Sequence, residues 1–166
     1  MGTGIHGGFG NSRGSKKFKK TGTLEPCKNT YTRDSLINEL QGYTETSTKI
    51  AAGLKNGDIH INILGDRLFE DYLGCDKKTV AVTIGKQIYL RRSSASIISD
   101  LVHEGTHALD YISGVHIENI RTWPGEIRAY KAEREFQIKT NRKLDFETED
   151  DLYVHVWKNY ERGDTK

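Results

Sequence analysis

Apolar residues recur at helical spacing in several separate stretches of the chain. This spacing gathers them on one face of a helix, which can then be buried. Because glycines and capping residues mark helix ends, the first predicted helix begins near residues 32–34 and ends before Gly42. By the same reasoning, further helices are predicted at residues 45–54, 97–112 and 126–139, and from Thr148 onward.

Three shorter stretches have the pattern of β-strands. Residues 59–63 alternate apolar and polar side chains, which predicts a strand with one buried face. Residues 79–84 and 87–90 flank Gly85-Lys86, so they predict a hairpin. Two arginines follow the second arm, as in an exposed edge strand. The chain is therefore predicted to be α+β, with a small mixed or antiparallel sheet whose edge strand, near residues 87–92, packs on the following helix, and with a helical C-terminal part.

The first 26 residues differ from the rest of the chain. They are rich in glycine and lysine and lack a hydrophobic period, so residues 1–26 are interpreted as a basic linker or leader. Residues 27–166 are predicted to form one domain, a length that can bury a core. No apolar run is long enough for a membrane span, and no secretory signal segment is present.

The overall composition gives little evidence of a particular partner. The net charge is +2, from 25 basic and 23 acidic residues, so the chain as a whole is not predicted to bind nucleic acid specifically. The two cysteines, Cys27 and Cys75, are too far apart in sequence for a metal knuckle. They either form one disulfide or are both free thiols, so the redox compartment and the localisation stay open.

The segment His103-Glu104-Gly105-Thr106-His107 is the strongest chemical feature, because it has the form H-E-x-x-H inside a predicted helix. Four residues advance a helix by just over one turn, so both imidazoles project from one face. Two imidazoles at this spacing can occupy two corners of a tetrahedral zinc site. Glu104 would then lie beside the metal, where it could accept a proton from the attacking water.

A catalytic zinc site needs a third protein ligand. Glu126 is the preferred candidate, since it opens a helix 19 residues after His107 and that helix can return antiparallel. Asp110 lies one turn after His107 and is better suited to orient a ligand than to bind zinc. His116 and Glu118 follow Gly114 closely and remain alternatives.

The pattern His103-Glu104-x-x-His107, followed by a helix carrying Glu126-x-x-Ala129-Tyr130, resembles a minimal form of the gluzincins, the thermolysin-like clan of zincin-fold zinc metallopeptidases. The resemblance covers roughly residues 59–137. It implies a zincin-like fold, a zinc cofactor held by His103, His107 and Glu126, and Glu104 as general base. The metzincin pattern is absent, because Asp110 and Ser113 replace its glycine and third histidine.

The activity expected from this resemblance is cleavage of a protein or peptide substrate. A peptide would pair with the edge strand near residues 87–92 by β-augmentation. Glu104 would move the proton of the attacking water to the leaving amine. The oxyanion needs a further donor, and the candidates are Tyr130, His155, Tyr153 and Arg128.

The leader sequence Gly2-Thr3-Gly4-Ile5-His6-Gly7-Gly8-Phe9-Gly10-Asn11-Ser12 resembles the junctions that precede C-terminal toxin domains of bacterial polymorphic toxins. This resemblance implies secretion or delivery into a target cell within a larger toxin, and an immunity protein as partner.

Two other functions compete with a peptidase. One is an inactive zincin-fold binding protein, and the other is a metal-dependent nuclease toxin, which the balanced charge disfavours.

Overall fold

The structure is a computed structural model that describes residues 31–115 and 122–160. In chain order, its helices and strands are α2 (Arg33–Leu40), α3 (Glu45–Asn56), β1 (His60–Leu64), α4 (Asp66–Leu73), β2 (Ala81–Ile84), β3 (Gln87–Arg91), α5 (Ile97–Ile112), α6 (Trp123–Lys139) and α7 (Glu149–Asn159). The predicted α+β class with a small mixed sheet and a helical C-terminal part is confirmed. The leader at residues 1–26 and Cys27 lie outside the described residues.

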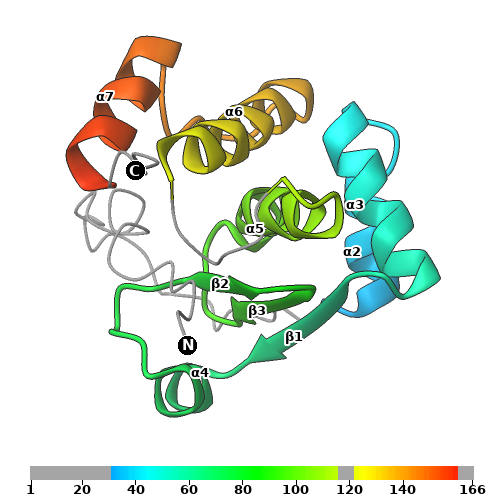
Figure 1. The fold of residues 1–166 in the computed structure, drawn as a ribbon. Helices are drawn as coiled ribbons and strands as arrows, with labels where there is room; N and C mark the ends of the chain where they lie inside the picture. Colours follow the sequence, from blue (N-terminus) through cyan, green and yellow to red (C-terminus); the bar gives the residue numbers. More distant parts are fainter. Residues whose placement is uncertain (1–30, 116–121, 161–166) are drawn as a thin grey trace, which may run out of the picture.

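The elements form layers on either side of the sheet. Figure 1 shows α4 below the sheet, α5 above it and α6 above α5, with α2 and α3 beside α5. The helix α5 contacts β2, β3, α3 and α6, so it is the central element of the fold. The H-E-x-x-H segment therefore lies in the helix that the other layers surround.

Side-chain caps explain where several helices begin. Thr32 and Thr44 each form a reciprocal capping box with the serine three residues later. Thr148 does the same with Asp151, in the place of the preferred glutamate. The helix α6 begins at Trp123, where Thr122 caps it and Pro124 occupies its first turn.

The prediction that residues 87–92 form an edge strand is wrong. The strand order is β1-β3-β2, so β3 is the central strand. It pairs antiparallel with β2 through the predicted hairpin and parallel with β1, where Ile61 lies opposite Ile88. A hairpin pattern identifies one partner of a strand, but not a second partner that is distant in sequence. Among the described strands, β1 and β2 are the outer ones.

Arg91, at the end of β3, is buried rather than exposed. Its guanidinium donates to Glu70 at 2.7 Å and to the carbonyl of Thr79 at 2.8 Å, and it lies over the ring of Phe69. Arg91, which suggested an exposed edge in the sequence, therefore joins α4 and the segment just before β2 to the central strand. A buried cation is tolerated here because its hydrogen bonds replace those to water.

Two hydrophobic clusters stabilise the described domain. The larger cluster joins the inner sheet face to α2, α3, α5 and the Phe136 end of α6. The smaller joins α6 to α7 through Tyr130, Leu152 and Val156.

The packing of α5 against α3 explains the glycine at position 105, inside the H-E-x-x-H segment. A Cβ on Gly105 would lie 2.6 Å from Ile50, so glycine permits the close approach of α5 to α3.

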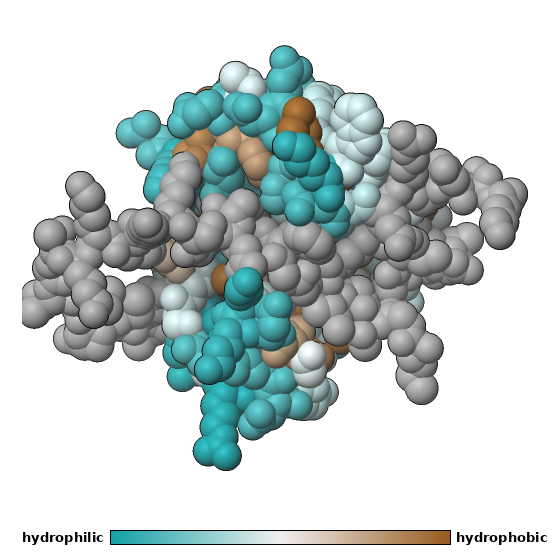
Figure 2. All heavy atoms as spheres, turned by 90° about the vertical axis from the view of Figure 1, so that its left-hand side faces the viewer, coloured by the Kyte–Doolittle hydropathy of each residue, from teal (hydrophilic) through white to brown (hydrophobic). Residues whose placement is uncertain are grey.

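The described surface on the α7 side is mainly hydrophilic, with hydrophobic residues in small separate groups (Figure 2). Trp157 is the most exposed of the large apolar side chains on α7. Within residues 31–115 and 122–160, none of the helices is both long and apolar enough to cross a membrane.

Candidate metal centre

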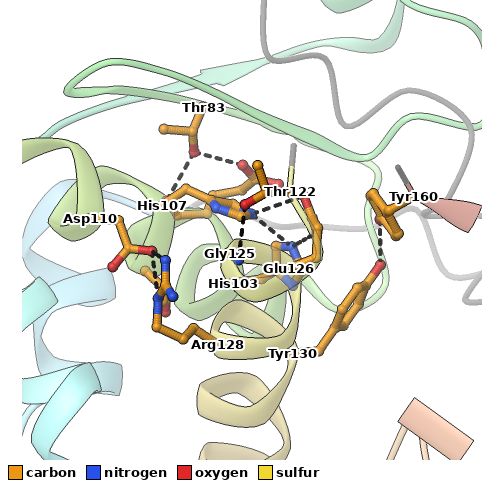
Figure 3. Close-up of polar contacts among 12 residues, drawn as sticks. Thr83, His103, His107, Asp110, Thr122, Gly125, Glu126, Arg128, Tyr130 and Tyr160 are labelled. Carbon is orange, nitrogen blue, oxygen red and sulfur yellow. Dashed lines mark hydrogen bonds and ion pairs between the residues drawn. The ribbon is translucent and has the colours of Figure 1, made fainter. Parts of the chain in front are cut away.

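The two histidines of α5 bring their imidazoles together in the interior. Nε2 of His103 lies 3.3 Å from Nε2 of His107, as the spacing of one helical turn predicts (Figure 3). His103 is almost fully buried, whereas the side chain of His107 is one-fifth exposed. The pair therefore has one side that solvent or a ligand can reach.

Glu126 of α6 completes a group of three donors. Its Oε2 lies 3.4 Å from Nε2 of His103, and its Oε1 lies 3.5 Å from Nε2 of His107. A carboxylate in the first turn of a helix is favourable by itself, but the helix dipole does not explain why the side chain is only 1% exposed. The structure thus brings Glu126 together with both histidines.

The spacing of the three donors fits a tetrahedral metal ion. Zinc bonds of 2.0–2.1 Å to nitrogen and oxygen give tetrahedron edges of about 3.3–3.4 Å. The three contacts, at 3.3, 3.4 and 3.5 Å, are close to these edges. His103, His107 and Glu126 also form the one group within the described part of the chain that can hold a metal ion by the proximity of its donor atoms. Their chemistry and geometry fit zinc.

The electrostatic surroundings of His107 also favour a cation. Burial lowers the pKa of His107, but the carboxylates of Glu126, Glu104 and Asp110 outweigh this, and the pKa lies above its usual value. The acidic groups that stabilise a protonated imidazole would equally stabilise a divalent ion at the same place.

Glu133 orients His103 and was not foreseen in the sequence. Its Oε2 lies 3.2 Å from Nδ1 of His103, and both side chains are buried. A carboxylate here accepts a hydrogen bond from Nδ1–H, so that the Nε2 lone pair faces His107 and Glu126. The sequence contains one weak signal for this role: Glu133 lies two helical turns after Glu126 and therefore shares its face of α6.

We expect Glu133→Gln to weaken zinc binding by about tenfold, the lower end for residues that orient a metal ligand, because the amide still offers an acceptor but no charge. Competition with a chromophoric chelator would measure the affinity. Glu135→Gln is the matched control, since it removes the same charge from an exposed position on the same helix. Equal affinities for the two variants would show that Glu133 does not orient the ligand.

Thr83 holds the predicted general base and was also missed. Its hydroxyl lies 2.6 Å from Oε2 of Glu104 and 2.9 Å from the carbonyl of the same residue. Thr83 belongs to β2, so the outer strand is fastened to α5 beside the histidines (Figure 3). A threonine in a β-rich stretch resembles any strand residue, and no sequence signal distinguishes this one.

The predicted oxyanion donors lie in different surroundings. The Tyr130 ring packs edge-on against His103 at a centroid distance of 4.3 Å, and its hydroxyl lies 2.9 Å from that of Tyr160. His155 packs against Tyr130 and Phe146, and its Nδ1 lies 3.3 Å from the Asn159 amide. Tyr130 therefore contacts His103 directly, and His155 is linked to it through Tyr130. The catalytic roles of both residues stay predictions.

The remaining candidates are placed as follows. Asp110 accepts two hydrogen bonds from Arg128, at 2.9 and 3.0 Å. Tyr153, on α7, lies 3.3 Å from the amine of Lys131. His116 and Glu118 lie outside the described residues.

Comparison with known proteins gives no relative: no family model, curated protein or solved structure matches this chain.

Proposed function

We propose that the protein is a zinc-dependent endopeptidase. The observation that carries the proposal is the triangle of His103, His107 and Glu126, whose edges suit a tetrahedral ion, with Glu104 on the same helix. The three residues would hold zinc and leave one position open. Bound zinc supplies Lewis-acid chemistry, by acidifying water and polarising a carbonyl.

The protein's own residues would divide the remaining work. Glu104 would accept a proton from the attacking water and pass it to the leaving amine as the carbon–nitrogen bond breaks. Thr83 would keep the Glu104 carboxylate in place. Glu133 would keep the imidazole of His103 turned toward the ion.

An extended substrate would pair with β2 rather than with β3. The central strand β3 already has partners on both edges, while β2 is an outer strand among those described. Thr83 lies in β2, so a peptide added to this strand would run beside Glu104. The β-augmentation expected from the sequence is thus kept, but with β2 in place of β3.

The proposal that the domain is delivered as a toxin rests on the leader resemblance.

We expect the purified protein to contain one zinc ion and to cleave unfolded casein. Free zinc at a hundred times Kd should stabilise the fold by about 2.7 kcal/mol, and a chelator should remove both the stabilisation and the cleavage. Elemental analysis, thermal unfolding and gel electrophoresis would measure these effects. Zinc binding without cleavage of any protein would favour an inactive binding protein. Metal-dependent cleavage of plasmid or RNA would favour a nuclease.

A further inference from the structure

A line of buried polar side chains leads away from the candidate metal centre along α6. Glu126, Glu133 and Gln137 are each only 1% exposed. They lie at helical positions i, i+7 and i+11, which share one face. Polar groups are costly to bury unless they are hydrogen-bonded, so the partners of Gln137 are informative.

The amide of Gln137 bridges two carboxylates. Its Nε2 donates to Glu133 Oε1 at 3.4 Å and to Asp145 Oδ2 at 2.7 Å, while its Oε1 accepts the backbone N–H of Asp145 at 3.3 Å. Only an amide can provide two N–H donors and one acceptor in this arrangement, because a carboxylate of the same shape has no donor. Gln137 thus links Glu133 to the connection between α6 and α7.

The same connection reaches His103 by a second route. Phe146 follows Asp145 directly and packs edge-on against Tyr130 at 5.4 Å, and Tyr130 packs against His103 at 4.3 Å. Asp145 is therefore linked to His103 through the polar side chains of Gln137 and Glu133. Phe146 is linked to the same histidine through the ring of Tyr130.

We propose that Gln137 is a positioning residue that couples metal binding to the order of the α6–α7 connection. Its amide fixes the Glu133 carboxylate on Nδ1 of His103 and holds Asp145 in place by the same set of hydrogen bonds. Coupling between two sites is reciprocal. Zinc should therefore slow the opening of the connection, and loosening the connection should weaken zinc binding. This inference rests on the proposed zinc site but not on peptidase activity.

The test uses Gln137→Met, which keeps the length of the side chain and removes its hydrogen bonds. We expect zinc affinity, measured by chelator competition, to fall about tenfold, as for other residues that orient a metal ligand. In the wild type, zinc should slow hydrogen exchange of the segment 141–147 about fivefold, the lower end of usual coupling. In Gln137→Met this slowing should be lost.

Two further variants keep the outcome clear. Gln87→Met is the matched control, because the Gln87 amide is half-buried and bonded to Asn62 between β1 and β3; its zinc affinity should equal that of the wild type. Asp145→Ala changes a partly exposed residue, so it decides the question if Gln137→Met does not fold. It too should lose the zinc-dependent slowing.

The possible results separate the inference from the proposed function. If the wild type binds zinc, and Gln137→Met or Asp145→Ala keeps both the affinity and the slowing, the inference is overturned and the zinc site stands. If the wild type does not bind zinc, the proposed function fails and the inference fails with it.

Discussion

Replacing Glu104 by glutamine should leave zinc bound and reduce peptide hydrolysis by two to four orders of magnitude, the usual contribution of a general base. Glutamine has the size of glutamate and still offers an oxygen to the Thr83 hydroxyl, which lies 2.6 Å from the native carboxylate. It cannot accept a proton from water. The loss should therefore appear in turnover rather than in folding or metal content.

Parallel measurements of zinc content and casein cleavage would test this expectation. Glu45→Gln is a suitable control, because Glu45 is an exposed residue of α3 that pairs with Lys49. It removes the same charge far from the histidines in sequence and should behave as the wild type. A Glu104→Gln protein that cleaves at an undiminished rate would rule out Glu104 as the base.

Local sequence pattern was sufficient for the helix that carries the candidate site. The periodicity from Ile97 to Ile112 and the stop at Gly114 gave the bounds of α5, because a helix forms among residues close in sequence. The position of Glu126 followed from the same helix and from a second one long enough to pack on it. Helix periodicity and helix length were therefore sufficient to expect His103, His107 and Glu126 near one another.

The sheet order was not predictable in this way. The parallel pairing of β1 with β3 joins residues about 27 apart, such as His60 and Gln87, and depends on the whole chain folding around α5. Periodicity reports which face of a strand is buried but not which strand lies beside it. An outer strand of the sheet is therefore β2 rather than β3, and β2 replaces β3 as the proposed peptide-binding strand.

The supporting residues were missed because their types are usually exposed. Glu133 and Gln137 look like the solvent side of a charged helix, and only tertiary packing buries them. Once buried, each must be hydrogen-bonded. Gln137 donates to Glu133 four residues away, but their other partners, His103 and Asp145, lie at least eight residues away in sequence. A carboxylate buried against a histidine can thus indicate a metal centre in a structure, whereas its burial cannot be recognised from the sequence.

Glu126→Ala should lower zinc affinity by more than about a hundredfold, beyond the usual effect of residues that only orient a ligand. The variant leaves two histidines, and two donors do not make a stable zinc site. Without zinc, the variant should also be less stable, because the imidazoles of His103 and His107 lose a buried carboxylate neighbour. The loss of zinc affinity should therefore be read from the difference between the stabilities with and without zinc.

Thermal unfolding with and without zinc distinguishes a ligand from a merely structural acid. The wild type should gain about 2.7 kcal/mol at a hundred times its Kd, whereas Glu126→Ala should gain almost nothing at the same zinc concentration. Asp110→Ala is the informative comparison, because Asp110 lies near His107 but is engaged by Arg128 at 2.9 Å. It should keep most of the zinc-dependent gain. If Glu126→Ala keeps the full gain instead, another acid must be the third ligand, and Asp110 and Glu118 become the next residues to replace.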